Sequence, residues 1–483
     1  PDERVRSDPS LSVNYAWNLF LSGQIGAVEE RLNDAESLLT RQKTPIESEQ
    51  VTELFCQINT IRAIIFGIQG RSMRSTEVAQ QVLKLLPDGR LSERGILLLT
   101  LAVNFRDVGD IAQASQSYAD AVTLLLAAEN IMAAIMAVEQ LVRLLVMQGK
   151  LGQAVEICQE MLDASAEFSA AEQLRVRSSD MARANMSYVL YERNELADAE
   201  VYVRQGIKQA KRGGFLQSLV VGYILLARIL QARGDADGAN KMLQAAINSA
   251  QMDIQQIYRV ELTACQVQLW LAQEELDTAS RWAHESNLSA EIEINLQNEY
   301  EQISLARVLV AQGRASSDGA KLTRGLGLID RLALSAESAG RIGHLIDLLN
   351  LQALALDALG DLDQALSCLE RALELAEPQG FVRIFLDNGC PIIRLLKEAA
   401  RRNIAADYAI KLLNLIDTDT QPDRPNLSSP SLLVYPLSDR ELEVLHLMAQ
   451  DLTYQEMANQ IMVSLNTVRT HVKNIYSKLM VHK

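Results

Sequence analysis

The sequence predicts an all-α protein, with a long solenoid of helical hairpins followed by a small helix-turn-helix domain. Three observations lead to this fold class. The 483-residue chain is rich in Ala and Leu and has only 5% aromatic residues, a composition that favours helices over strands. A short motif recurs about every 40 residues through most of the chain, and three closely spaced helix-start signals follow near the C-terminus.

The repeated motif is a turn residue, a polar residue, usually Leu or Ile, two small or polar residues, and Ala. It occurs as GDIAQAS at 109, GKLGQAV at 149, NELADAE at 194, GDADGAN at 234, EELDTAS at 274 and GDLDQAL at 360, with weaker copies at 23 and 70. Gly at the turn supplies the left-handed conformation that ends one helix, and the small Ala lets the next helix approach closely. About nine hairpins are expected between residues 11 and 377, stacked into a superhelix because no hairpin can bury its apolar face alone.

Two segments interrupt this rhythm and divide the chain. Residues 376–416 contain FVRIFLDNG, which ends in a turn, and CPIIRLLKEAARR, which begins a helix with Pro in its first turn. Residues 418–436 hold four prolines and many small polar residues, a composition typical of linkers. We therefore predict a helical-repeat sensor domain at 1–417, a linker at 418–436 and a DNA-binding domain at 437–483.

The C-terminal segment has the start signals of three short helices. Ser438 with Glu441 and Thr453 with Glu456 fit two capping boxes, and Ser464 or Asn466 begins the third helix. The short turn before the third helix predicts a helix-turn-helix. The expected inward side chains are Leu442, Leu445, Met448, Met457, Ala458, Ile461, Val468, Val472, Ile475 and Leu479.

The opposite face of the third helix is short, polar and basic. It carries Asn466, Arg469, Thr470 and Lys473. Such a face suits a major groove, where it can donate hydrogen bonds to base edges and phosphates. Because residues 437–483 contain five acidic and five basic side chains, this attraction is local rather than a property of the whole domain.

The segments LSDRELEVL and YQEMANQIMVSLNTVRTHVKNIYSKL closely resemble the LuxR-type DNA-binding domain. The repeats look like tetratricopeptide repeats with a lengthened period. Together with the opening RSDPSLSVNYAWNLFLSGQIGAVEERLNDAE and AEPQGFVRIFLDNG, they resemble the large MalT-like regulators of bacteria. The resemblance implies a sensor region for a small molecule or protein signal, with a signal-transducing NTPase before residue 1. ATP is therefore expected only for that preceding domain, and no cofactor for this chain.

The resemblance also implies roles for individual residues. Arg469, Thr470 and Lys473 match the base-reading surface. Ser464, Asn466, Thr467 and Lys478 match positions that hold the phosphate backbone, and Glu456 matches a structural acid of the second helix. The family's fourth helix, which commonly supports dimerisation, would lie beyond Lys483. Self-association is therefore expected of the active protein.

Other function classes lack sequence support. No G-x-x-x-x-G-K-[ST] phosphate loop occurs, and the near-match GRASSDGAKLT at 313–323 is interpreted as a repeat turn. The five His residues show no metal-ligand spacing, and five widely separated Cys residues predict reduced, mostly buried thiols. No apolar stretch of 18 residues predicts a membrane span.

The predicted function is that of a cytoplasmic, signal-responsive transcription regulator that binds double-stranded promoter DNA and is not an enzyme. The alternative is a tetratricopeptide protein-protein interaction scaffold that does not bind DNA. A docking motif would place apolar anchors where this chain has Asn466, Arg469, Thr470 and Lys473. The sequence does not identify the residues that bind the signal.

Overall fold

The fold was analysed in a computed structural model of the full chain. The structure describes residues 8–21, 24–41, 49–167, 172–251, 256–292, 294–419, 444, 447–448, 453–460, 468 and 472. The chain divides into two compact units, Pro1–Asp417 and Thr418–Lys483.

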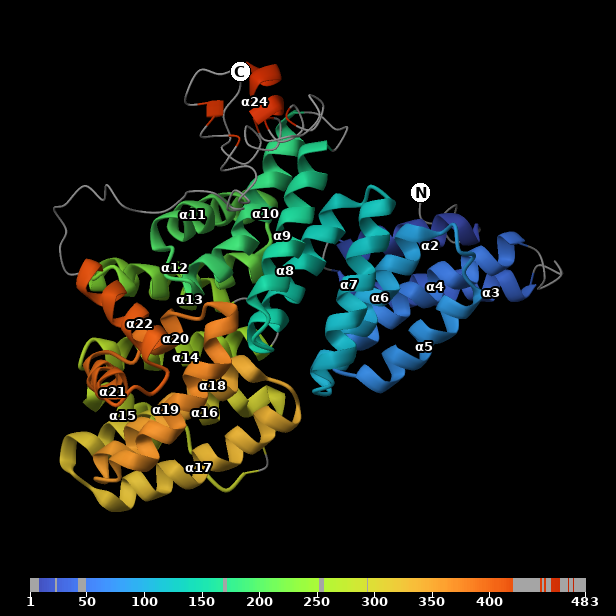
Figure 1. The fold of residues 1–483 in the computed structure, drawn as a ribbon. Coiled ribbons are helices and arrows are strands. Elements are labelled where there is room, and N and C mark those ends of the chain that lie inside the picture. The colour runs from blue at the N-terminus through green and yellow to red at the C-terminus, as the bar shows by residue number, and fades with distance from the viewer. Residues whose placement is uncertain are drawn as a thin grey trace. The chain divides into compact units, whose positions relative to one another are not determined.

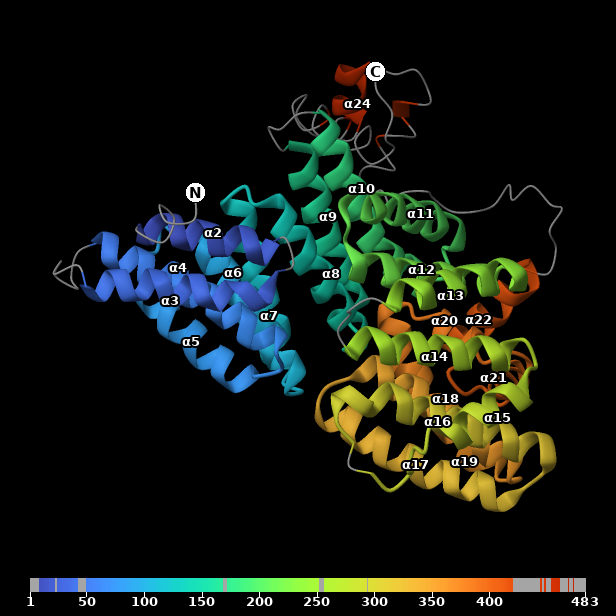
Figure 2. The same ribbon diagram turned by 180° about the vertical axis from the view of Figure 1, so that it is seen from behind.

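Nine helical hairpins form most of the described part of the first unit (Figures 1 and 2). Their pairs are α2 (Pro9–Leu21) with α3 (Ile25–Arg41), α4 (Glu49–Ile68) with α5 (Ser72–Leu85), α6 (Leu91–Asp107) with α7 (Ile111–Ala127), α8 (Ile131–Met147) with α9 (Leu151–Glu167), α10 (Glu172–Glu192) with α11 (Leu196–Gly213), α12 (Leu216–Ala232) with α13 (Ala236–Ala250), α14 (Gln256–Ala272) with α15 (Leu276–Glu285), α16 (Leu296–Ser316) with α17 (Gly319–Ser338), and α18 (Ile342–Ala358) with α19 (Leu362–Ala376). Each hairpin packs on the next, which confirms the predicted all-α solenoid.

The turns inside the hairpins have the predicted backbone geometry. The glycines of the repeated motif have positive φ angles, at Gly109 (+87°), Gly149 (+74°), Gly234 (+81°) and Gly360 (+89°). Two further copies of the motif place Asn194 (+65°) and Glu274 (+61°) in the same left-handed region. In three turns the Asp after the glycine caps the following helix by accepting a hydrogen bond from a backbone N–H, at Asp110, Asp235 and Asp361.

The alanine of the motif is fully buried where the two helices of a hairpin meet. Ala154, Ala239 and Ala365 each expose 0% of their surface. Glu374, on the outer side of α19, is exposed. The predicted helical register of the repeats is therefore confirmed at these positions.

The superhelix curls far enough for α18 to contact α8, although nine helices lie between them along the chain. A Cβ atom on Gly343 would lie 2.4 Å from the carbonyl oxygen of Val146, so only glycine allows this approach. At the adjacent turn, a Cβ on Gly149 would lie 3.0 Å from the Cβ of Ile342. The sequence predicted a superhelix but not this closure.

Residues 377–419 leave the hairpin pattern, as predicted. They form η1 (Glu377–Gln379), α20 (Arg383–Leu386), α21 (Cys390–Arg401) and α22 (Ala406–Asp419). Pro391 lies in the first turn of α21, which follows Gly389 at a φ of +67°. Helix α22 includes the first two residues of the segment 418–436, and the rest of that segment lies outside the described residues.

Helix α4 is the one described helix that is long and apolar enough to cross a membrane by composition, over Val51–Ile68. In the structure it is the first helix of the second hairpin, and it buries Ile58, Ile61 and Ile65 in a core shared with α2 and α3. Core packing therefore accounts for its apolar character.

The phosphate-loop near-match at 313–323 forms the turn between α16 and α17. Ser317 has a φ of +51°, and the Asp318 side chain accepts hydrogen bonds from the backbone N–H groups of Ala320 and Lys321. This carboxylate occupies the start of α17, where a phosphate would have to bind, so the structure supports the repeat-turn interpretation.

The five Cys residues are free. Cys56, Cys158 and Cys265 are buried, Cys368 is half-buried and Cys390 is exposed. Burial raises the pKa of the Cys265 thiol to about 12, so this side chain stays neutral.

Candidate functional site

The second unit contains the predicted capping box of its second helix. The Glu456 carboxylate accepts hydrogen bonds from the backbone N–H and the hydroxyl of Thr453, at 2.8 and 2.7 Å, ahead of α24 (Tyr454–Gln460). The hydrogen bonds from Thr453 lower the pKa of Glu456, which therefore stays charged at the helix start. Met457, Val468 and Val472 are buried as predicted, together with Val444 and Leu447, and Met448 is half-buried.

The residues predicted to contact DNA lie outside the described residues. These are the base-reading candidates Arg469, Thr470 and Lys473 and the phosphate-contacting candidates Ser464, Asn466, Thr467 and Lys478. Their assignment stays a prediction. What the structure adds is that Val468 and Val472, each directly before a base-reading candidate in sequence, expose 0% and 4% of their surface.

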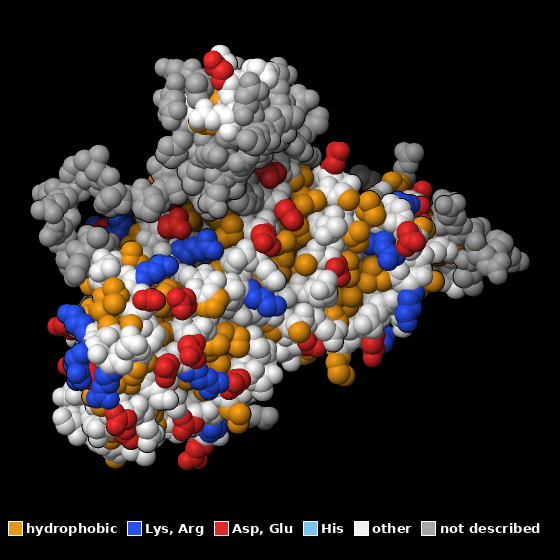
Figure 3. Space-filling model, in the orientation of Figure 1, with side chains coloured by type: hydrophobic (Ala, Val, Ile, Leu, Met, Phe, Trp, Pro, Cys, Tyr) orange, Lys and Arg blue, Asp and Glu red, His pale blue; other side chains and the backbone are white. Residues whose placement is uncertain are grey.

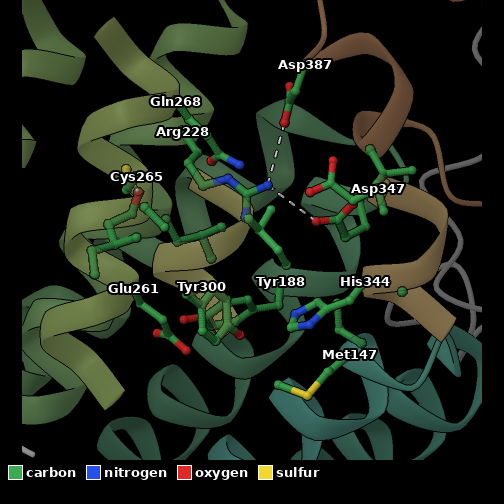
Figure 4. Close-up of a pocket in the computed structure, with 18 of the residues that line it drawn as sticks. Met147, Tyr188, Arg228, Glu261, Cys265, Gln268, Tyr300, His344, Asp347 and Asp387 are labelled. Atoms are coloured by element: carbon green, nitrogen blue, oxygen red, sulfur yellow. Dashed lines mark hydrogen bonds and ion pairs between the residues drawn. The ribbon is translucent and has the colours of Figure 1, made fainter. Parts of the chain in front are cut away.

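The first unit contains a cavity of about 190 Å³ on the inner side of the superhelix (Figure 4). Six successive first helices of hairpins line it, from α8 to α18, and α20 closes one side. Representative side chains are Arg143 on α8, Tyr188 on α10, Arg228 on α12, Glu261 on α14, Arg307 on α16 and His344 on α18.

Helical spacing explains why these side chains share the cavity. Tyr188 and Glu192 are four residues apart on α10, and His344 and Asp347 are three residues apart on α18. Positions three or four residues apart lie on the same side of a helix. Each hairpin therefore contributes one stripe of its first helix to the wall, while the second helix packs on the outside.

Most of the charged groups in the wall are paired. The Arg143 guanidinium donates to Glu261, and Nη2 of Arg307 donates to both carboxylate oxygens of Asp347, at 2.7 and 2.8 Å. Below His344, the fully buried Glu299 accepts from Arg341 at 2.9 Å and lies 3.0 Å from Nδ1 of His344. Burial alone would raise the pKa of Glu299, but the interactions with His344 and Arg341 outweigh it and lower that pKa.

The segment 379–388 lies against the inner wall and is held from several repeats. The backbone N–H of Val382 donates to the carbonyl oxygen of Glu192 at 2.7 Å, and Asn350 donates to the carbonyl oxygen of Ile384 at 3.1 Å. At the two ends of the segment, Gln379 accepts from the backbone N–H of Gly152, and Asn388 accepts from Arg307. The segment thus connects α9, α10, α16 and α18 across the superhelix.

Asp387 is the main electrostatic anchor of this segment. It accepts hydrogen bonds from Nε of Arg383 at 3.0 Å and from the Tyr191 hydroxyl at 2.5 Å. Although burial acts to raise it, the pKa of Asp387 is lowered by the charges of Arg383 and Arg228. Burial, the largest influence, raises the pKa of the neighbouring Glu192 to about 7.

Sequence reasoning identified none of the cavity residues. A signal was present, however, because helix α12 reads LQSLVVGYILLARILQA and has Arg228 as its one charged residue. An isolated charge in an otherwise apolar helix is costly to bury unless it has a partner or a function. Helix α8, IMAAIMAVEQLVRLLVM, gives a weaker signal of the same kind, because Glu139 and Arg143 are its only charged residues.

Comparison with known proteins identifies both parts of the chain. Residues 56–402 match the family model described as MalT-like TPR region, and residues 435–483 match that described as bacterial regulatory proteins, luxR family. The HTH-type transcriptional regulator MalT of Serratia proteamaculans is 23% identical over 507 residues, covering 99% of this chain and 53% of that protein. The MalT of Vibrio cholerae is also 23% identical and covers 98% of this chain and 52% of its own length.

The chain thus spans about half the length of the curated relatives it matches. Among solved structures, a Rap protein complexed with competence and sporulation factor has a TM-score of 0.53 at 14% identity, covering 78% of this chain and 99% of that one. This likeness supports the solenoid fold. The chain belongs to the MalT-like family, with a MalT-like TPR region followed by a C-terminal domain of the bacterial LuxR regulatory family.

Proposed function

We propose that the protein is a signal-responsive transcription regulator whose solenoid cavity receives a small molecule and whose C-terminal helix-turn-helix binds promoter DNA sequence-specifically. The proposal rests on two features that occur together. The same chain contains a cavity lined by charged side chains of six repeats and a terminal segment that matches the LuxR family. A polar cavity inside a helical repeat array is a site for recognition, and a helix-turn-helix converts recognition into a choice of DNA sequence.

Arg469, Thr470 and Lys473 are proposed to read bases, and Ser464, Asn466, Thr467 and Lys478 to hold the phosphate backbone. The burial of two valines supports the base-reading set. Val468 and Val472 are buried and four residues apart, so they define one inward side of the recognition helix. At 100° per residue, Arg469, Thr470 and Lys473 then fall away from that side.

On the solenoid face shown in Figure 3, Asp and Glu side chains are mixed with Lys and Arg among the described residues. No continuous basic patch covers the described part of that face. Such a surface gives phosphate no extended attraction. That face gives no reason to place DNA contact on the solenoid, and we assign the contact to the C-terminal segment that matches the LuxR family.

The test is a binding-site selection followed by mobility-shift titration of single variants. Arg469→Ala and Lys473→Ala should each weaken specific binding by about 1–3 kcal/mol, and Thr470→Ala should change the selected sequence more than the affinity. Lys208→Ala on the exposed side of α11 is the control and should leave both unchanged. Identical selected motifs and affinities for all variants would remove the base-reading assignment and favour the interaction scaffold.

Three further expectations belong to this proposal. Self-association should accompany DNA binding, because one three-helix module makes few phosphate contacts and two modules on two half-sites make twice as many. A cytoplasmic location follows from promoter binding. No catalytic role is assigned to these 483 residues, and any ATP-dependent step is placed in the part of the longer relatives that this chain does not span.

A further inference from the structure

Arg228 differs from the other arginines around the cavity. Arg143, Arg307 and Arg383 each donate hydrogen bonds to a carboxylate, on Glu261, Asp347 and Asp387 respectively. Within the described part of the chain, none of the five N–H donors of Arg228 makes a hydrogen bond. Its Nη2 lies 3.6 Å from Glu192 and 3.5 Å from Asp387, and its buried Nε has no partner.

The nearest carboxylates do not fully balance this charge. Asp387 already accepts hydrogen bonds from Arg383 and Tyr191. Glu192 exposes only 7% of its surface, and its Oε2 has no hydrogen-bond partner in the described structure. Burial raises the pKa of Glu192 to about 7, so much of it is neutral at physiological pH. A guanidinium with five donors and no committed acceptor is costly to enclose unless an anion completes the site.

The orientation of Arg228 is fixed before any ligand arrives. Its guanidinium lies over the Tyr191 ring, with Cζ 4.5 Å from the ring centroid. Stacking of this kind restricts the planar group and leaves its edge available for hydrogen bonding. Gln268, one turn of α14 beyond Ala264, lies beside Arg228 in Figure 4, and its side chain likewise makes no hydrogen bond to the described residues.

We propose that the cavity binds a small organic monoanion through its carboxylate, with Arg228 donating to the carboxylate and Gln268 and Glu192 completing the polar end. The inference rests on the proposed function of the cavity as the signal site and names the chemical class of the signal. The planar fork of arginine matches the two oxygens of a carboxylate.

The charge of the site favours a carboxylate over a phosphate monoester. Among the arginines lining the described cavity, Arg228 is the one that makes no hydrogen bond to a carboxylate, and the carboxylates of Glu261, Asp347 and Asp387 line the same cavity. A monoanion matches one available positive charge, whereas a dianion would place a second negative charge among these acids.

The cavity also sets the size and character of the rest of the ligand. Figure 4 shows Arg228 and Gln268 toward one side of the cavity and Tyr188, Tyr300 and Met147 toward the other. These three residues offer apolar surface to a ring or a short chain. An extended peptide would need the length of the inner groove, part of which the segment 379–388 already occupies, so the volume of about 190 Å³ favours a small molecule.

The experiment is isothermal titration calorimetry on the full 483-residue chain. The probes are benzoate and phenylacetate, their neutral amides benzamide and phenylacetamide, and phenyl phosphate as the dianion. At least one carboxylate should bind about tenfold more tightly than its amide and than phenyl phosphate. Arg228→Gln should abolish this preference. Arg228→Lys, which retains charge without the fork, should weaken binding, and Gln268→Ala should weaken it without requiring any change to Arg228.

Arg204→Gln is the matched control, because Arg204 is a half-exposed arginine on α11 paired with Glu200 outside the cavity. It should bind the carboxylates as the parent chain does. Equal binding of acid and amide, tighter binding of phenyl phosphate, an unchanged preference in Arg228→Gln, or no binding of any carboxylate up to its solubility limit would each overturn the inference.

A mobility-shift titration with the same probes separates this inference from the proposed function. If a neutral amide alters DNA binding as strongly as its acid does, the cavity senses a signal of another class, and only the carboxylate assignment is lost. If the carboxylates bind through Arg228 but do not change the affinity of the chain for a promoter fragment, the carboxylate site stands and the signal-responsive function fails.

Discussion

Nη2 of Arg228 on α12 and Oε1 of Glu192 on α10 lie 3.6 Å apart, facing one another across two successive repeats. The separation is too long for a hydrogen bond, so the pair is joined by charge alone. Glu192 also provides the backbone carbonyl that accepts from Val382. One residue therefore touches both the repeat wall and the segment that crosses the superhelix.

The stability of the solenoid should fall as pH rises from about 4.5 to about 7 because of Glu192. Burial raises the pKa of Glu192 from its usual value of 4.5 to about 7. The charges of Arg228 and Arg383 act to lower this pKa, and those of Asp387 and Asp347 act to raise it further. A raised pKa means that the folded state binds the proton more tightly. The contribution of Glu192 to the free energy of unfolding is thus fully present below the unfolded pKa. It falls by about 3 kcal/mol as pH rises through the folded pKa.

Glu192→Gln should remove this part of the pH dependence, because a neutral amide replaces the protonated acid at similar size. Urea unfolding of both proteins across the pH range measures the difference. Glu374→Gln on the exposed side of α19 serves as the control and should follow the parent curve. Parallel curves for the parent and Glu192→Gln would show that Glu192 does not titrate in this window.

Closure of the superhelix should depend on Gly343. Gly343→Ala places a Cβ 2.4 Å from the Val146 carbonyl oxygen, so α8 and α18 must separate, at about 1–3 kcal/mol. Gly327→Ala on α17 is a matched helical control, because an added Cβ there meets nothing within 4 Å. That control should be neutral or stabilise by up to about 1 kcal/mol. Equal thermal shifts in the two variants would exclude a tight contact between α8 and α18.

Glycine in place of Glu274 should stabilise the turn between α14 and α15. Glu274 has a φ of +61°, where a side chain is strained, while four equivalent turns have glycine. Glu274→Gly should therefore raise stability, by up to about 1 kcal/mol after the greater unfolded-state freedom of glycine is subtracted. The reverse change, Gly360→Ala, should destabilise, since its φ is +89°. Thermal midpoints that move the same way in both variants would contradict this account.

Overpacking should distinguish the inside of a hairpin from its outside. Ala365→Leu adds three carbon atoms to a site with 0% exposure and should cost about 1–3 kcal/mol. Glu374→Leu, nine residues later on the exposed side of the same helix, should change stability by no more than about 0.5 kcal/mol. Similar losses in both variants would mean that the helical register of the repeats differs from the one described.

Local rules were enough to predict the hairpins. A glycine with positive φ, a capping Asp and a buried Ala act within one turn or one helix pair, so Gly360, Asp361 and Ala365 can be recognised in sequence. The same applies to the capping box of Thr453 and Glu456. Each of these features depends on residues only a few positions away, so it can be predicted from the local sequence.

The cavity could not be predicted because its residues meet only after several hairpins have stacked. Gly343 and Val146 are nearly two hundred positions apart, and the small rotation from each repeat to the next decides whether they touch. Glycine at 343 has no motif that identifies it as a contact site. The lone Arg228 of α12 was the available signal, but its neighbours Glu192 and Asp387 follow only from the closed superhelix.

Asp387 should contribute more to the stability of the packed segment 379–388 than any surface ion pair does. Asp387→Asn leaves the guanidinium of Arg383 and that of Arg228 without their shared anion, and should cost about 2–4 kcal/mol at neutral pH. Asp363→Asn is the control, because Asp363 is 88% exposed in its pair with Arg402 and should change stability by no more than about 0.5 kcal/mol. Because Arg383 and Arg228 lower the pKa of Asp387, its contribution is present above the usual value of 3.8 and is lost as pH falls through the lower folded value. The difference in the free energy of unfolding between the parent and Asp387→Asn should thus become smaller in acid. A difference that does not change with pH would assign the loss to shape rather than charge.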